Sequence, residues 1–198
     1  MNVVYKIEFH TDWHCGSGLA AGADVDELVI KDKNGLPFVP GKTIKGLVSE
    51  AVADILFFSK ADGKQPAFDE AFGANEAGKH KKGVCFFTNA ELPAALQVEI
   101  LAEEPDVEKP GIVEYLYRTA AATAIDKKTG TAKEHSLRRM ETVVPCTLVG
   151  EITNVPQGME ELIANGLAYI KRLGKNRNRG LGRCTITIID SEEGGSIS

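Results

Sequence analysis

Two stretches of the chain repeat apolar residues at helical spacing, and each lies between segments with the alternating pattern of a β-strand. The first helix is predicted over residues 42–58, after a break at Pro40–Gly41, and the second over residues 157–172. An amphipathic helix buries one face only, so both helices need a sheet to cover. The strand pattern is clearest at the start of the chain, where four apolar residues alternate with more polar ones: Val3, Tyr5, Ile7 and Phe9.

Further strands are predicted from apolar runs, with a turn at residues 32–35 and a break near Pro145; they cover residues 28–31, 83–89, 141–153 and 184–188. Residues 60–82 are polar and rich in glycine and lysine, and are predicted to form a loop. The order of strands and helices fits a ferredoxin-like β-α-β-β-α-β core, an α+β fold with an open antiparallel sheet and two helices on one face.

The length of 198 residues fits one domain, residues 1–190, with an insertion at about 91–139 that projects from the core. In that insertion the alternation fades, and prolines, acids and then basic residues appear. The last residues, 191–198, are polar and glycine-containing and are predicted to be a disordered tail.

The charge of the chain is segregated, although its net value of −5 argues by itself against a nucleic-acid partner. Residues 171–183 hold six basic residues and no acid, and residues 127–139 hold five basic residues and one acid, Glu134. Acids gather instead at residues 99–108. Because binding depends on where charges lie, the two basic segments are candidate anion-binding surfaces.

The four cysteines are widely scattered and form no CxxC pair, which is typical of reduced thiols rather than of a disulfide framework or a zinc site. No run of about 18 apolar residues predicts a membrane span. The N-terminal residues lack the apolar stretch of a signal peptide. These features predict a cytoplasmic protein without a membrane partner.

The segment Leu173–Arg183, LGKNRNRGLGR, is called the Gly/Arg loop below and is the best candidate for phosphate binding. Its glycines allow close backbone approach and expose N–H groups, while its basic side chains supply charge and paired donors. A solvated loop after a helix is the alternative. Unopposed cations repel one another and favour an anionic partner; the residues proposed to bind are Lys175, Arg177, Arg179, Gly180, Gly182 and Arg183.

Two further segments are candidate functional sites, one for phosphate binding and one for metal binding or proton transfer. Pro40–Gly46, PGKTIKG, places Lys42 and Lys45 on the first turns of a helix, where phosphate binds well, but the GxxxxGK[ST] spacing of a P-loop is missing. An ordinary helix start with exposed lysines remains the alternative there. The loop 14–27 contains His14 and three carboxylates, one of which could hold a divalent cation or accept a proton from a ribose 2′-hydroxyl. Solvated acids are the alternative in this loop.

These motifs, in this order, resemble the RAMP superfamily of CRISPR-associated RNA-binding proteins. More narrowly, the chain resembles the repeated backbone subunit of type III (Csm/Cmr-type) interference complexes. The matching segments are the N-terminal strand running into His14–Gly18, then Asp26–Asp32, Leu36–Gly46, Ala124–Glu141 and Gly180–Arg183.

The resemblance implies an RRM-like palm, with residues of about 91–139 forming a thumb that intrudes between guide-RNA bases. It implies copies polymerised along a CRISPR RNA, beside other effector subunits. It also implies endoribonuclease cleavage of the paired target RNA by a loop aspartate with Mg²⁺ or Mn²⁺. The matching aspartate is Asp26, which would also be the metal ligand, with Asp24 as the alternative. The remaining RNA contacts expected are His14, Lys127, Lys128, Arg138 and Arg139.

Two other functions stay open at this point. One is a structural RAMP subunit that holds guide RNA without cleaving, and the other is a CRISPR RNA-processing endoribonuclease, which would usually depend on a histidine. The PGKTIKG segment favours the backbone subunit over the processing enzyme, and Asp26 favours cleavage over a purely structural role.

Overall fold

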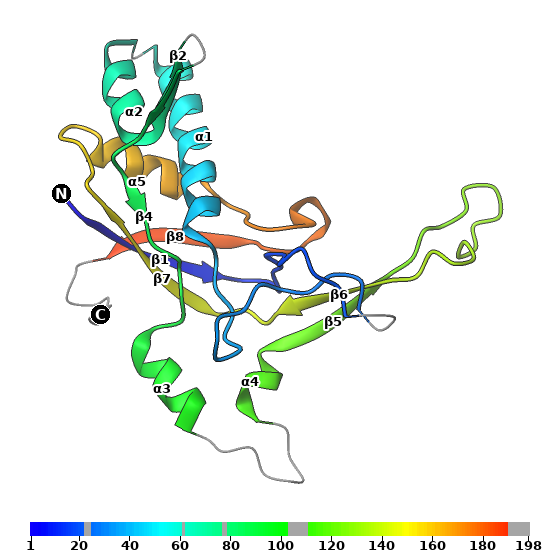
Figure 1. Ribbon diagram of the computed structural model, residues 1–198. Helices are drawn as coiled ribbons and strands as arrows, with labels where there is room; N and C mark the ends of the chain where they lie inside the picture. The colour runs from blue at the N-terminus through cyan, green and yellow to red at the C-terminus, as the bar shows by residue number, and fades with distance from the viewer. Residues whose placement is uncertain (22–24, 61, 77–78, 103–110, 190–198) are drawn as a thin grey trace.

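The computed structural model describes residues 1–21, 25–60, 62–76, 79–102 and 111–189. Its centre is an antiparallel sheet of four strands in the order β4-β7-β1-β8 (Figure 1). The strands are β1 (Val3–Phe9), β4 (Phe86–Phe87), β7 (Thr147–Thr153) and β8 (Cys184–Ile189). Along the chain, α1 (Gly41–Ser59) follows β1, and α5 (Glu160–Tyr169) follows β7. The predicted α+β class and antiparallel sheet are confirmed.

One face of the sheet and the two helices share the core. The four alternating apolar residues of β1 are buried, as predicted, and Ile7 pairs with Leu148 of β7 on one side and Ile186 of β8 on the other. Helices α1 and α5 lie side by side over the sheet (Figure 1). They are in close contact at Gly166, where a Cβ atom would lie 2.8 Å from Cγ2 of Val52.

The prediction of a loop over residues 60–82 is wrong. The segment holds a 3₁₀ turn, η1 (Asp62–Lys64), the helix α2 (Gln65–Phe72) and a hairpin of β2 (Gly73–Glu76) and β3 (Lys79–Lys82). Phe68 and Phe72 lie one helical turn apart, with ring centroids 5.0 Å apart, and Phe72 lies 6.2 Å from Phe87 of the sheet. The aromatic contact of Phe72 with Phe87 therefore anchors to the sheet a segment whose composition is mostly polar.

The predicted strand at residues 28–31 is also wrong. These residues make isolated bridges instead, Val29 with Gly16 and Lys31 with Pro37. The predicted turn that follows is confirmed, because Asp32 Oδ1 accepts the N–H groups of Asn34 and Leu36.

Three other elements differ from prediction in extent. The strand expected at residues 83–89 is reduced to β4, and the helix expected at 157–172 is limited to α5. The strand expected at 141–153 divides at Pro145, where a break was predicted, into β7 and β6 (Arg138–Val143).

A two-stranded hairpin projects from the core (Figure 1). It pairs β5 (Tyr117–Ala122) with β6 from Tyr117↔Val143 to Ala122↔Arg138, and residues 123–137 connect the strands. Together these segments are called the arm. The predicted insertion also holds α3 (Ala94–Ala102) and α4 (Ile112–Tyr115). Leu92 and Ile100 are buried in the core, so the first part of the insertion is attached to the core, while most residues of α3 are exposed.

None of the helices in the described part of the chain is long and apolar enough to cross a membrane. The predicted disordered tail, residues 191–198, lies outside the described residues.

Candidate functional site

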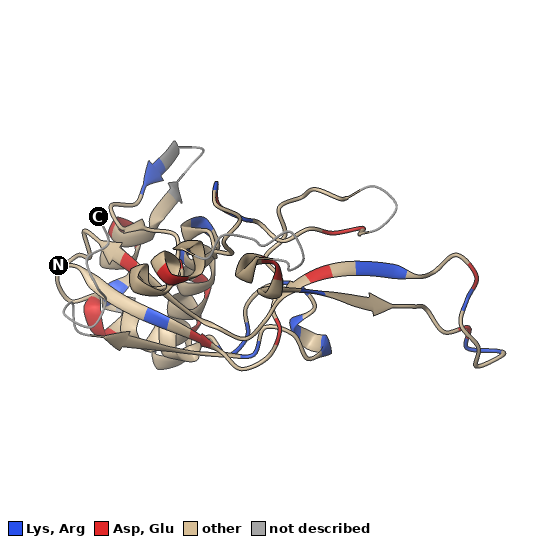
Figure 2. Ribbon diagram, turned by 90° about the horizontal axis from the view of Figure 1, so that it is seen from below, with Lys and Arg blue, Asp and Glu red and all other residues tan. Residues whose placement is uncertain are grey.

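Three segments that are far apart in the sequence line one cavity of about 290 Å³. They are the loop before residue 31, the inner half of the arm, and the Gly/Arg loop. Five of the predicted site residues meet there, one carboxylate and four cations: Asp26, Arg138, Arg139, Lys175 and Arg179. Figure 2 shows basic residues of the arm along β6 and toward its outer end. Ala120, Ala122, Met140 and Leu181 form the apolar part of the lining.

Asp26 is attached to the arm by two hydrogen bonds, both to the backbone of Arg139. Its N–H donates to the carbonyl oxygen of Arg139 at 2.9 Å, and its Oδ2 accepts the N–H of Arg139 at 2.7 Å. Glu27 continues this pairing, because its carbonyl accepts the N–H of Glu141 at 3.0 Å. One oxygen of the Asp26 carboxylate is thus used to hold β6, while the residue is exposed and lines the cavity.

The positive charge of Lys175 is paired with the carboxylate of Glu27. Its Nζ lies 2.6 Å from Oε1 of Glu27, and the two side chains are 54% and 36% exposed. Its N–H donates to the carbonyl oxygen of His14 at 2.9 Å. The preceding Gly174 has φ +94° and packs directly on that same carbonyl, so a larger residue would push the Gly/Arg loop off the His14 loop.

His14 is an internal residue of the site. Its side chain is 1% exposed, and Nδ1 lies 2.7 Å from the carbonyl oxygen of Glu141. A carbonyl only accepts, so Nδ1 carries the proton and Nε2 points toward Oε2 of Glu27 at 4.0 Å. In this conformation the ring supports the two loops from inside, which does not fit the expected direct contact of His14 with RNA.

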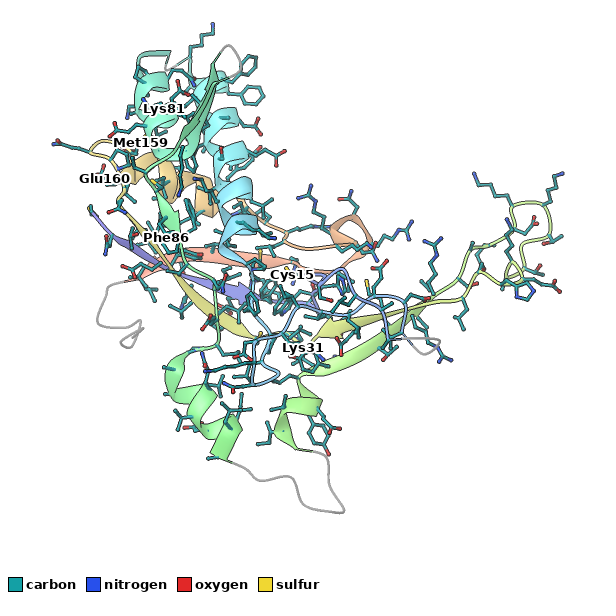
Figure 3. The ribbon with its side chains drawn as sticks, viewed as in Figure 1. Cys15, Lys31, Lys81, Phe86, Met159 and Glu160 are labelled. Atoms are coloured by element: carbon teal, nitrogen blue, oxygen red, sulfur yellow. The ribbon has the colours of Figure 1, made fainter. Side chains whose placement is uncertain are left out.

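Glu141 and Lys31 are structural residues of the site that the sequence reasoning missed. Oε2 of Glu141 accepts the N–H of Val29 at 3.0 Å, and Oε1 lies 2.8 Å from Nζ of Lys31. The ammonium group of Lys31 also lies 3.8 Å from the ring centroid of Tyr117 on β5, where the arm begins (Figure 3 labels Lys31). Both residues lie in the segments that carried the family resemblance, but sequence gives no sign of a pairing across 110 positions.

The other predicted RNA contacts do not line this cavity. Lys127 and Lys128 are exposed on the connection at the outer end of the arm. Arg177 lines a separate hollow of about 190 Å³ near α1 and α5, together with Glu50 and Asp54.

The last three residues predicted in the Gly/Arg loop lie on its returning half. Gly180 has φ +94° in open space, and the N–H of Gly182 donates to the carbonyl oxygen of Asp12 at 2.8 Å. Arg183 is exposed, with its N–H bound to Oγ1 of Thr11.

The N-terminus of α1 forms contacts within the protein. The N–H of Gly41 donates to Oδ1 of Asn89 at 3.1 Å, and Gly41 packs directly on the carbonyl of Phe87. Lys42 is exposed, and Lys45 lines a third hollow. The structure therefore places neither lysine at the Asp26 cavity.

Metal binding at Asp26 would depend on the RNA. Within the described residues, no three His, Cys, Asp or Glu side chains come together in a way that could hold a metal ion. Mg²⁺ is commonly bound by one or two carboxylates plus substrate phosphates and water, and the Asp26 carboxylate fits such a partial ligand set. Asp24, the alternative catalytic residue, lies outside the described residues.

The cysteines offer no thiolate to this site. All four are free, and burial raises the pKa of Cys15 to about 12 and those of Cys146 and Cys184 to about 11. Thiols with such pKa values are protonated at neutral pH, so they are poor nucleophiles and poor metal ligands.

A family model described as the RAMP superfamily matches residues 6–185, nearly the whole described chain. The chain belongs to the RAMP superfamily. The matched region of this RAMP chain includes the four-stranded sheet, the arm and the Gly/Arg loop. No curated protein sequence matches it.

Among solved structures, the RAMP chain is similar to a chain of the type III-B Cmr-beta complex bound to cognate target RNA. The TM-score is 0.69 at 12% identity, and the match covers 95% of this chain and 97% of the other. It is also similar to a chain of the apo state of type III-B Cmr-beta, with a TM-score of 0.67 at 13% identity over 96% and 98% of the two chains. At these identities the likeness shows a shared fold.

Proposed function

We propose that this RAMP chain is a CRISPR RNA-binding backbone subunit of a type III effector complex, and that it cleaves the paired target RNA at Asp26. The observation that carries the proposal is the cavity in which the Asp26 carboxylate meets cations from the arm and from the Gly/Arg loop. The shared fold with type III-B Cmr-beta chains, one of them in a complex bound to target RNA, supports the same role.

In this proposal the four-stranded sheet with α1 and α5 is a ferredoxin-like, RRM-like palm, and the arm is the thumb. The strand order β4-β7-β1-β8 and the chain order of strands and helices support the palm. The projecting hairpin with basic residues supports the thumb. Copies of the chain would repeat along the guide, next to other effector subunits.

The cations around the cavity would bind the RNA backbone. Arg138, Arg139 and Arg179 offer planar, paired donors to phosphate, and phosphate contacts position a strand without reading its sequence. Guide and target read each other by base pairing, so a protein that binds shape and charge accepts any guide sequence.

Cleavage would use the nucleophile of the RNA itself. The Asp26 carboxylate would accept the proton of a ribose 2′-hydroxyl, whose oxygen attacks the adjacent phosphorus while the 5′-oxygen leaves and takes a proton from water. The products would be a 2′,3′-cyclic phosphate and a 5′-hydroxyl. The neighbouring guanidinium groups would stabilise the charge that develops on the phosphate. A divalent metal ion held by Asp26 and RNA oxygens would neutralise the same charge.

The decisive substitution is Asp26→Asn rather than Asp26→Ala. Asparagine keeps an oxygen that accepts the N–H of Arg139, so the attachment of β6 is preserved while the base is lost. Complexes assembled with guide and labelled target RNA should lose cleavage by roughly 10²- to 10⁴-fold, the usual contribution of a general base, with unchanged target binding. Asp32→Asn is the matched control, because that carboxylate also accepts backbone N–H groups but lies outside the cavity.

One observation favours a second candidate, the non-cleaving structural subunit. The Oδ2 of Asp26 already has a structural partner in the N–H of Arg139, which is sufficient reason for an aspartate at this position. In that case the wild-type complex does not cut. Asp26→Ala would then weaken guide binding by loosening the arm, and Asp26→Asn would leave it intact. Full cleavage by Asp26→Asn would remove Asp26 from the chemistry.

A further inference from the structure

The third hollow, which Lys45 lines, has a volume of about 310 Å³ and lies between α1 and the β2–β3 hairpin. Three lysines from two distant segments line it: Lys45 on the second turn of α1, and Lys81 and Lys82 on β3. The rest of the lining is small or aromatic and consists of Phe72, Gly73, Ala74 and Gly83. Figure 3 labels Lys81 and shows it on the hairpin beside α2, away from the arm.

The positive charge of this hollow is not balanced from within. No carboxylate belongs to its described lining, and within the described residues none of the three lysines forms an ion pair. Burial raises the pKa of Cys85, Lys45 lowers it and Glu70 of α2 raises it, so Glu70 and Lys45 both lie near this thiol, but Glu70 does not line the hollow. Three ammonium groups around one space repel each other, which favours an anionic ligand.

The backbone that carries Lys81 and Lys82 is held firmly in place. Gly73 and Gly83, at the base of the hairpin, pack against backbone atoms, and a Cβ atom on Gly73 would lie 2.6 Å from the carbonyl oxygen of Lys81. The N–H groups of Val84 and Cys85 donate to the carbonyls of Glu70 and Ala71, at 2.9 and 3.1 Å. The hairpin is therefore fixed to α2, and the lysines are presented on a preorganised frame.

We propose that Lys45, Lys81 and Lys82 form a second phosphate-binding site, which holds the backbone of an RNA strand outside the Asp26 cavity. Lysine binds phosphate as a point charge and is depleted from the cores of protein–protein interfaces, so its predominance here favours RNA over a protein partner. The site extends the RNA-binding part of the proposed function and does not depend on cleavage. A strand bound at both cavities follows a longer path over the chain than the arm and the Gly/Arg loop alone provide.

The test compares three variants of the full chain. The first carries Lys45→Gln, Lys81→Gln and Lys82→Gln. The second, a control with the same loss of charge, replaces three exposed lysines that line none of the cavities described above: Lys33→Gln, Lys60→Gln and Lys64→Gln. The third, called the arm variant, replaces the three arginines of the Asp26 cavity, two from the arm and one from the Gly/Arg loop: Arg138→Ala, Arg139→Ala and Arg179→Ala. Each is titrated into a labelled oligouridine strand at several salt concentrations, after thermal unfolding has shown a native transition.

Each phosphate contact to a single strand contributes about 0.7 to the slope of log Kd against log salt, so the first variant should lose about two units of slope. The control should lose less than half of that. Combining the first variant with the arm variant should lower the slope further, because the two sites are separate.

Three results would overturn the second site: an unchanged slope, a loss equal to that of the control, or a loss confined to the binding of another protein subunit. If only the arm variant weakens binding, the second site is wrong and the proposed function stands. If the arm variant binds RNA as wild type does, the proposed function fails, whatever the lysine variant shows.

Discussion

Replacing Glu27 by glutamine should strengthen RNA binding, although the residue lies in the site. Glu27 neutralises Lys175 through an ion pair of 2.6 Å, so a phosphate must displace its carboxylate to reach that lysine. Both side chains are more than one third exposed, and ion pairs in such positions are worth about 0.2 to 1 kcal/mol. Removing the competitor should therefore tighten binding by about 1.4- to 5-fold.

The salt dependence gives a second, independent test of the same change. Because the phosphate reaches Lys175 in both proteins and only the competing ion pair is lost, the number of phosphate contacts is the same, and the slope of log Kd against log salt should stay nearly unchanged. Fluorescence anisotropy titrations of a labelled single strand measure both quantities. Glu151→Gln is the matched control, since Glu151 accepts a hydrogen bond from Asn2 and pairs with no cation in the described part of the chain.

The double variant Glu27→Gln, Lys175→Gln should lose the gain in RNA affinity, because Glu27→Gln acts by freeing Lys175. The departure of the two substitutions from additivity measures this coupling. Weaker binding by Glu27→Gln would show that Glu27 acts mainly by holding the Gly/Arg loop in place. A gain of the same size in Glu151→Gln would reduce the effect to net charge. Either result refutes the exchange of Glu27 for phosphate.

Three other predictions concern stability. Gly166→Val should lower the free energy of unfolding by about 1–3 kcal/mol in denaturant titrations, because the new side chain overlaps Val52. Trp13→Ala should cost about 3–5 kcal/mol, because the fully buried indole stacks on Phe9 at 4.5 Å; a smaller loss would mean that the site collapses around the gap. The pKa of Cys146 is raised by burial from 9.0 to about 11, so the native state favours the neutral thiol and stability should fall as pH rises from 9 to 11. Cys146→Ser should make that fall less steep, while Cys15 and Cys184, whose pKa values burial also raises, account for the rest of it.

The sequence predicted those elements whose apolar residues follow a strict period. The first strand and the first helix were found nearly to the residue, because one face of each is buried in the core. Residues 60–82 were missed because only a few residues of α2, among them Phe68, Ala71 and Phe72, pack on the core, too few to give a clear periodic pattern. The strand expected at residues 28–31 was missed for the opposite reason. Its apolar residues are buried or half-buried, but the backbone bridges first to Gly16 and then to Pro37 instead of following one partner strand.

The site was predicted as a set of residues but not as an arrangement. The family resemblance pointed to Asp26, and charge clustering pointed to the arm and the Gly/Arg loop, which the structure brings to one cavity. Charge alone could not show that Lys175 is paired with Glu27, or that the His14 ring is buried. Nor could it separate Lys45 from the other cations, because that depends on where a distant hairpin folds back. Side-chain pairings between remote segments are set by the tertiary fold.

The arm is a ribbon of two strands with their connection, and in the described part of the chain no third strand or helix lies along its outer half. A lone two-stranded hairpin is at best marginally stable in water. The outer half of the arm thus contributes little to the stability of the core, and its length can change without cost to folding. In the repeating assembly that we propose, insertions or deletions between Ala122 and Arg138 would change how far each subunit reaches along its neighbour, while the four-stranded sheet and the Asp26 cavity stay unchanged.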